Sequence, residues 1–95
     1  KKIIKTRKKI WEIYYNELKS IKEISLPYIP KECNHNGHIF YIKTSKRNEL
    51  LQFLKDNKIM ATFHYVPLHL SPAGKIYGKF IGVDEYTTIE SNKLI

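Results

Sequence analysis

Two short apolar runs, one on each side of an amphipathic segment, constrain the fold of this chain more than any other feature. In residues 38–43 (HIFYIK) and residues 59–65 (IMATFHY), successive side chains would point to opposite faces of a β-strand. Pro67 stops the second run, because a proline has no backbone N–H to give to a sheet. Both faces of the first run carry apolar residues, so we expect it to lie within a sheet and to be covered on both sides.

The segment between the two runs, residues 46–56, has the apolar spacing of a helix. Ser45 is suited to cap its first turn, and Asn57 is suited to end it in the left-handed conformation. The order of strand, helix and strand predicts a short β-sheet with flanking helices, in which both apolar runs are paired. The buried stripe of the helix is expected to consist of Leu50, Leu51, Phe53 and Leu54.

The N-terminal residues 1–22 are also predicted to be helical, because their apolar side chains fall on one stripe and lysines fill the other side. We expect Trp11 and Tyr14 to anchor this stripe in the core. No capping residue precedes the stripe, so we expect the chain to begin inside a helix.

The C-terminal part shows fewer regular patterns. Residues 66–86 hold most of the glycines, and we expect them to form a loop. Thr87 and Glu90 have the spacing of a capping box, which predicts the start of a helix over residues 87–95. The sequence stops within that helix, so we expect both ends of the chain to be truncated.

The charge of the chain is concentrated at its N-terminus. The formal net charge of the 95 residues is +8, and six lysine and arginine residues lie within residues 1–9. A basic helix end is more often a solvated face than a nucleic-acid site, so we expect no nucleic-acid partner. The single cysteine, Cys33, fits a reducing compartment, and no apolar run is long enough to cross a bilayer. The sequence thus predicts a cytoplasmic domain with no membrane partner.

The four histidines raise the question of a metal or catalytic site. Cys33, His35 and His38 on one side, and His64 and His69 on the other, lack the paired spacing of zinc ligands. Cys33 beside His35 or His38 is the only pairing available for nucleophilic catalysis, and no glycine-rich phosphate loop is present. We therefore expect no metal site and no catalytic residue in this chain.

His64 and Tyr65 are the stronger candidates for binding. A strand that ends in polar rings beside a proline presents hydrogen-bonding groups at a fixed edge. The alternative, that both are ordinary residues of a sheet, is equally compatible with the sequence.

Together with their neighbours, these residues resemble the C-terminal part of the DegT/DnrJ/StrS family of pyridoxal-phosphate-dependent sugar-nucleotide aminotransferases. The likeness covers essentially the whole chain, and its features follow in the family's order. It rests on Arg7, Ile10 and Tyr14, then Leu26-Pro27, residues 36–42 (NGHIFYI), Arg47 with Leu50 and Leu51, residues 64–69 (HYVPLH), Gly78 and Glu90.

The resemblance implies an α/β (α+β) fold, namely the small C-terminal domain of a fold type I pyridoxal-phosphate-dependent transferase. Residues 1–95 would be that domain in truncated form, which in the parent packs on a large pyridoxal-phosphate-binding domain within a homodimer. The lysine that forms the Schiff base belongs to the large domain. We therefore expect no cofactor on this fragment and no activity of the fragment alone.

The resemblance also implies a role in binding the substrate, a dTDP-sugar used in polysaccharide biosynthesis. Five side chains match the family's motif positions and are expected to line the sugar-nucleotide site: His38, Tyr41, His64, Tyr65 and His69.

An alternative from another functional class is a free-standing, small basic module that binds RNA or a protein partner. Residues 37–43 (GHIFYIK) carry aromatic side chains, as RNA-binding strands do, but lack the glycine and phenylalanine pattern of such strands. RNA binding that weakens with added salt would favour this alternative.

Overall fold

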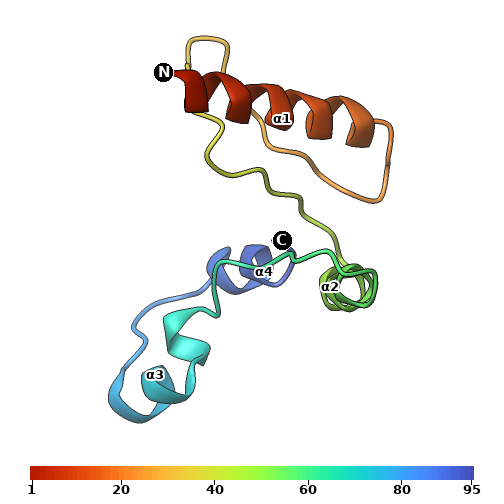
Figure 1. The fold of residues 1–95 in the computed structure, drawn as a ribbon. Helices are drawn as coiled ribbons and strands as arrows, with labels where there is room; N and C mark the ends of the chain where they lie inside the picture. The colour runs from red at the N-terminus through yellow and green to blue at the C-terminus, as the bar shows by residue number, and fades with distance from the viewer. The chain divides into compact units, whose positions relative to one another are not determined.

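Helices form all of the regular secondary structure of this chain. The structure, a computed structural model, describes residues 1–95 and divides them into two units, residues 1–43 and residues 44–95. None of the helices has the length and apolar character that a membrane crossing requires. Figure 1 shows α1 (Lys2–Leu18), α2 (Arg47–Asp56), the 3₁₀ turn η1 (Leu68–Leu70), α3 (Pro72–Tyr77) and α4 (Thr87–Ser91).

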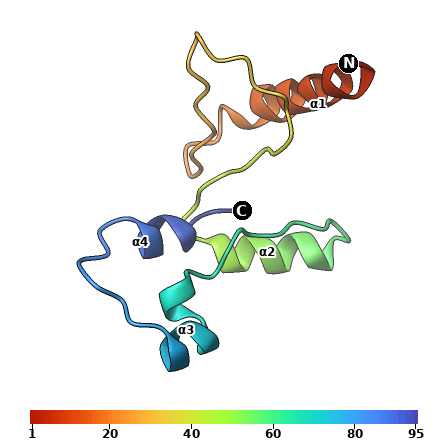
Figure 2. The same cartoon turned by 90° about the vertical axis from the view of Figure 1, so that its left-hand side faces the viewer.

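An aromatic cluster around Trp11 holds the first unit together. Trp11 is the only buried side chain among the large hydrophobic residues, with 8% of its surface exposed. Its ring stacks on Tyr15, with centroids 5.3 Å apart, and contacts His35 at 4.7 Å and Phe40 at 5.3 Å. The chain therefore leaves the end of α1 and returns along the same helix (Figure 2). The prediction that Trp11 is a core anchor is confirmed.

Tyr14, the second expected anchor, is only partly covered. Its ring stacks on Phe40 with centroids 5.4 Å apart, yet 53% of its surface is exposed. α1 also ends at Leu18 instead of residue 22. The N–H of Ile21 donates to the carbonyl oxygen of Leu18 at 3.0 Å, which tightens the end of the helix into a turn.

Gly37 is required where the returning chain crosses α1. Its φ of +63° lies in the left-handed region, and an added Cβ would stand 2.9 Å from backbone atoms of both Arg7 and Lys8. The side chains of Lys8 and Asn34 are hydrogen-bonded beside this crossing. A residue without a side chain therefore allows the two backbones to touch.

Neither of the two predicted strands forms in the structure. The only β-bridge is isolated and antiparallel, between Ser25 and Lys43, and no ladder extends from it. Residues 38–43 are not covered on both faces either, since 54% of Ile39 is exposed. An alternating pattern shows only which side chains could share a face. A strand also needs a neighbour that is hydrogen-bonded along its length, and residues 38–43 have one only at Lys43.

In the second unit, the predicted side-chain cap of α2 does not form. The N-cap position is Lys46, and its N–H donates to Oγ1 of Thr44 at 3.2 Å, whereas Ser45 was expected to cap. Thr44 is buried, and its own N–H donates to the carbonyl oxygen of Lys93 at 3.0 Å. This bond to a distant part of the unit holds Thr44 in place before the helix, where its hydroxyl accepts the N–H of Lys46, and no side chain makes a capping hydrogen bond to α2.

The end of α2 also differs from the prediction. Asn57 has a φ of −89°, and its side-chain amide donates to the carbonyl oxygen of Phe53 at 2.8 Å. The left-handed conformation falls on Lys58, with a φ of +61°. The Asn57 side chain already donates to a helix carbonyl, and the chain reverses its direction at the next residue, Lys58. Residues 59–63 then run back along α2 (Figure 2).

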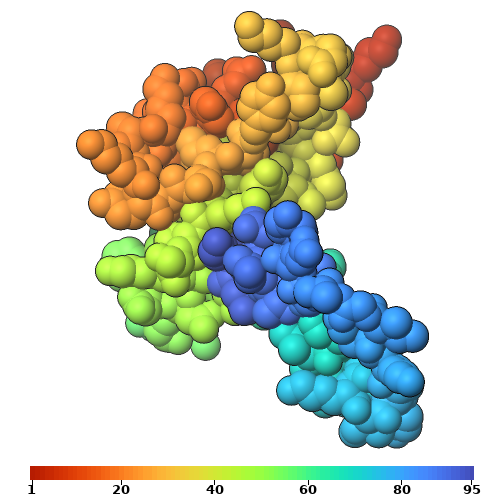
Figure 3. Space-filling view, turned by 180° about the vertical axis from the view of Figure 1, so that it is seen from behind, coloured from red at the N-terminus to blue at the C-terminus, as the bar shows by residue number.

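Residues 66–86, predicted as a loop, contain η1 and α3. Pro72 occupies the first turn of α3, and the side chain of Ser71 accepts a hydrogen bond from the N–H of Gly74 at 2.9 Å. A serine at the N-cap followed by a proline favours the start of a helix, and the short α3 begins in this way. Within the second unit, α3 and the segment after it project away from α2 and α4 (Figure 3).

We predict that Gly37→Ala destabilises the first unit by about 2 kcal/mol or more. The alanine would be forced into the left-handed conformation, and its Cβ would clash with the backbone of Arg7 and Lys8. Trp11 is the only tryptophan and lies in this unit, so its fluorescence during urea unfolding reports the change.

Gly82→Ala is the matched control. Gly82 also has a positive φ, +100°, but an added Cβ would meet no atom within 4 Å. This variant should leave the Trp11 transition unchanged. Equal transitions for Gly37→Ala and the unaltered chain would contradict the close crossing of the returning chain over α1.

Candidate functional site

Arg47, the first residue of α2, fastens the backbone that carries His64 and Tyr65. Its guanidinium lies 4.5 Å from the centroid of the Phe63 ring, in a cation–π contact. Its Nη1 also donates to the carbonyl oxygen of Ser91, at the end of α4, at 2.7 Å. The hydroxyl of Ser91 in turn donates to the carbonyl oxygen of Tyr65 at 2.8 Å. The segment is thus tied to both α2 and α4.

The side chains of His64 and Tyr65 are left exposed by this arrangement. Tyr65 is 73% exposed, and the two rings meet edge to face with centroids 4.6 Å apart. Neither the imidazole nor the phenol hydroxyl has a hydrogen-bond partner in the chain. An anchored backbone with two free polar rings can bind a ligand through both stacking and hydrogen bonds.

His69 lies in a separate group of side chains, which we call the His69 cluster: His69, Phe80, Asp84 and Thr88. Nε2 of His69 is 3.0 Å from Oδ2 of Asp84 and 3.1 Å from Oγ1 of Thr88. The hydroxyl of Thr88 donates to the Asp84 carboxylate, and the backbone N–H of Thr88 donates to it at 3.2 Å. The imidazole also contacts the ring of Phe80, with centroids 4.7 Å apart.

The same carboxylate starts α4, which corrects the predicted capping box. The residue before the helix is Tyr86, whose side chain makes no capping hydrogen bond, and Thr87 is already helical. Asp84, which lies outside the helix, instead accepts the N–H of Thr88 in the first turn. The expectation that Thr87 caps the helix was wrong, because Thr87 is already helical and the N–H of Glu90 donates to the carbonyl oxygen of Tyr86.

These contacts lower the pKa of Asp84 below its ordinary value. The largest cause is the hydrogen bond from the Thr88 hydroxyl; the backbone N–H of Thr88 and the charge of a protonated His69 act in the same direction, and partial burial opposes them. A lowered pKa in the folded state means that this carboxylate stabilises the fold above the ordinary carboxyl pKa of about 3.9. That contribution is lost as the pH falls through the lowered pKa.

The other two predicted site residues, His38 and Tyr41, belong to the first unit. The N–H of His38 donates to the side chain of Asn36 at 2.9 Å, while its imidazole is exposed; Tyr41 is half-buried. His35 serves packing instead, since it contacts Trp11, and its Nδ1 accepts the N–H of Gly37 at 3.2 Å.

In the second unit, the structure brings His64 and Tyr65 together but gives His69 different partners. Asp84 and Thr88 were missed by the sequence analysis, although an aspartate four residues before a threonine at a helix start is a signal that could have found them. No group of three or more histidine, cysteine, aspartate or glutamate side chains is placed to hold a metal ion.

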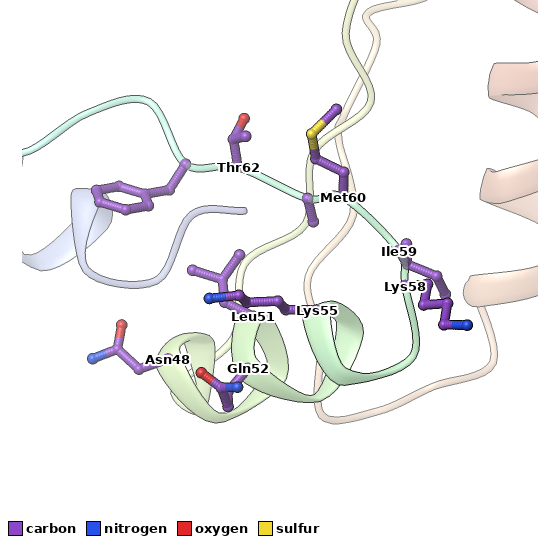
Figure 4. Close-up of a pocket in the computed structure, with 10 residues that line it drawn as sticks. Asn48, Leu51, Gln52, Lys55, Lys58, Ile59, Met60 and Thr62 are labelled. Carbon is purple, nitrogen blue, oxygen red and sulfur yellow. The ribbon is translucent and has the colours of Figure 1, made fainter.

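A shallow pocket of about 680 Å³ lies between α2 and the segment that runs back along it (Figure 4). Its walls are mainly apolar, and two lysines stand at its edge. None of the five predicted site residues lines it. The lining residues are Asn48, Leu51, Gln52, Lys55, Lys58, Ile59, Met60, Ala61, Thr62 and Phe63.

Comparison with known proteins places these features in a family context. The sequence model of the DegT/DnrJ/EryC1/StrS aminotransferase family matches residues 1–84. The erythromycin biosynthesis sensory transduction protein EryC1 of Saccharopolyspora erythraea is 34% identical over 61 residues, which cover 63% of this chain and 17% of the relative.

Two further relatives match a similar share of the chain. The dTDP-3-amino-3,4,6-trideoxy-α-D-glucose transaminase of Streptomyces venezuelae is 36% identical over 61 residues, covering 63% of this chain and 16% of the relative. An uncharacterised protein of Methanocaldococcus jannaschii is 28% identical over 74 residues, covering 72% and 19%. The chain therefore spans less than a fifth of the length of these curated relatives.

We predict that Thr88→Val raises the pKa of Asp84 toward its ordinary value, because the substitution removes the hydroxyl donor and keeps the backbone N–H. Loss of α4 on acidification should then begin at a higher pH. Carboxyl ¹³C NMR from about pH 2 to 6 measures the shift. Thr87→Val, which also keeps its backbone N–H, should leave the titration unchanged. An unaltered Asp84 titration in Thr88→Val would show that the hydroxyl has no such effect.

Proposed function

This chain belongs to the DegT/DnrJ/EryC1/StrS aminotransferase family, and on that premise we propose that it is the smaller, C-terminal part of a sugar-nucleotide aminotransferase. The observation that carries the proposal is the family match over residues 1–84. Because the chain spans less than a fifth of its relatives, the activity is proposed for a larger protein that contains these residues.

The exposure of apolar side chains supports a larger protein. Trp11 alone is buried among the large hydrophobic residues, whereas Met60 is 94% exposed and Tyr77 is 87% exposed. Large apolar side chains exposed in such number are typical of a chain that packs against other protein. We propose that a large cofactor-binding domain covers part of it, within a homodimer.

The proposal also extends to the fold class. Residues 59–65 follow α2 closely and make no β-ladder. We propose that they and residues 38–43 become strands of a short α/β sheet when the rest of the protein supplies their neighbours, as the alternation of their side chains favours.

Pyridoxal phosphate is proposed as the cofactor of the complete protein, where it would supply the electron sink for transamination. The residues of this chain do not fit a site for it. The carboxylate of Asp84, in the His69 cluster, already accepts a hydrogen bond from Thr88 and contacts His69. The sequence also has no glycine-rich loop that could hold the phosphate of the cofactor. We therefore place the cofactor on the large domain and assign to this chain a role in binding substrate.

The substrate contacts are proposed for the five motif side chains, His38, Tyr41, His64, Tyr65 and His69. The arrangement of His64 and Tyr65 supports this role most strongly, since their rings are free while Ser91 holds the Tyr65 carbonyl oxygen. A free imidazole and a free phenol can hydrogen-bond the hydroxyl groups of a sugar and stack on flat groups.

The substrate is proposed to be a dTDP-linked 4-keto-6-deoxy sugar. A relative named as a dTDP-amino-sugar transaminase supports the dTDP-sugar class. Residues 64–69 (HYVPLH), residues 71–74 (SPAG) and residues 86–91 (YTTIES) suggest, by sequence likeness, a dTDP-4-amino-4,6-dideoxygalactose transaminase. Such an enzyme would act in the biosynthesis of a cell-surface polysaccharide of the enterobacterial common antigen type.

We predict that the complete protein aminates dTDP-4-keto-6-deoxyglucose in the presence of pyridoxal phosphate and an amino donor, and that residues 1–95 alone form no amino sugar. The isolated residues should also retain no cofactor after borohydride reduction, because this chain offers no site for it. Product analysis by mass spectrometry measures both.

Turnover by residues 1–95 alone would contradict the division of roles between the two domains. RNA binding by the complete protein that weakens steeply with salt, without any transamination, would contradict the enzymatic function and favour a binding module instead.

A further inference from the structure

We propose that Asp84 and Thr88 are positioning residues that keep the ring proton of His69 on Nε2, so that Nδ1 is offered to a hydroxyl group on the hexose of the substrate. This inference rests on the proposed function and deepens it, since it says which atom of His69 meets which part of the nucleotide sugar.

The location of the proton follows from counting donors in the His69 cluster. The single hydroxyl proton of Thr88 is directed to the Asp84 carboxylate, so its oxygen can only accept from His69. The ionised carboxylate of Asp84 has no proton to give. Nε2 of His69 therefore faces two oxygen atoms that have no proton to give, at 3.0 Å on Asp84 and at 3.1 Å on Thr88, so the ring proton lies on Nε2.

The ring is also held in place on its other sides. Phe80 contacts its face, with centroids 4.7 Å apart, and the backbone of His69 lies in the η1 turn directly after the buried Pro67. With Nε2 fixed at one edge, rotation of the imidazole would break its hydrogen bond to Thr88 and its contact with Asp84 at once. The orientation of Nδ1 is therefore determined by the protein before any ligand arrives.

Nδ1 is the one polar atom of the cluster that remains available. It has no hydrogen-bond partner in the chain, and the structure contains no buried side-chain nitrogen or oxygen atom without a partner. Nδ1 is therefore accessible, while the His69 side chain as a whole is only 21% exposed. An accessible atom on a constrained ring is suited to recognising a ligand.

The chemistry of Nδ1 selects the group that it binds. In the neutral ring with the proton on Nε2, Nδ1 can only accept, so the ligand must donate. A sugar hydroxyl donates, whereas an ionised diphosphate has no proton to give and would approach the negative Asp84. The hexose of a nucleotide sugar carries several such hydroxyls, and we assign one of them to His69.

The position of the proton is tested by NMR on the complete protein with ¹⁵N-labelled histidine, in which His69→Gln identifies the signals. At a pH where the ring is neutral, we expect Nε2 to be protonated and Nδ1 to be bare. In Asp84→Asn, the amide oxygen should keep the Thr88 N–H and turn the NH₂ group toward His69, which moves the ring proton to Nδ1. Glu85→Gln removes the same charge at the next residue and should change nothing.

The ligand is tested by calorimetry with two probes, dTDP-glucose and dTDP, which differ by the hexose. Asp84→Asn should weaken binding of dTDP-glucose about tenfold, as expected for one lost hydrogen bond, and leave the affinity for dTDP unchanged. Thr88→Val keeps the Asp84 acceptor, so it should keep the proton on Nε2 and weaken dTDP-glucose by less. Glu85→Gln should affect neither probe.

Two results would overturn the inference: a protonated Nδ1 in the unaltered protein, or an equal loss of dTDP and dTDP-glucose in Asp84→Asn. If the unaltered protein binds neither probe, the proposed function fails together with the assignment of the hexose. The NMR measurement still decides in that case whether Asp84 positions the ring.

Discussion

The guanidinium of Arg47 is the contact on which the second unit depends most. This planar side chain lies over the Phe63 ring and donates to the Ser91 carbonyl oxygen. It therefore joins the start of α2 to Phe63 and to the end of α4. Ser91 in turn holds the backbone of Tyr65, because its hydroxyl donates to the Tyr65 carbonyl oxygen. A lysine could not replace Arg47, because a compact ammonium lacks the flat fork that stacks and donates in two directions. Two candidate substrate residues thus owe their backbone position to a side chain that need not touch the substrate.

The two longer helices, α1 and α2, were predictable because their signals are local, whereas η1 and α3 lie in a segment predicted as a loop. The apolar period of α1 and α2 and the size of Trp11 are properties of consecutive residues, and the structure places both helices within the expected segments. Their ends were not predictable in the same way. Ser45 does not cap α2: the N-cap position falls on Lys46, whose N–H donates to Thr44, and a bond to Lys93, far away in the sequence, holds Thr44 there.

The candidate site was predictable in its residues but not in its partners. The sequence pointed to His69, yet it gave no reason to connect it with Asp84, which lies fifteen positions later on a different segment. The expected capping box used the residues nearest to the helix start, whereas the structure uses a carboxylate further back. Spacing along the chain identifies candidate groups, and only the fold decides which of them share a proton.

The two apolar runs, which form no β-ladder in this chain, connect the fold to the proposed function. The alternating side chains of residues 38–43 and residues 59–65 are suited to a β-sheet. The hydrogen-bonded neighbours that would complete such a sheet would have to come from another part of the protein. The family match and the exposed apolar side chains support the same account, in which the rest of an aminotransferase completes this fold. In the proposed function, this chain binds the sugar nucleotide and a large domain binds the cofactor.

Amide hydrogen exchange in Met60, Ala61 and Thr62 tests this account most directly, because no backbone hydrogen bond ties these residues to another segment of the chain. In residues 1–95 alone, their N–H groups should exchange at nearly the rate of an unstructured peptide. In the complete protein, pairing with a neighbouring strand should slow exchange by about a hundredfold or more. Fast exchange in the complete protein would contradict the account, since the segment would then remain unpaired even with every other part of the enzyme present.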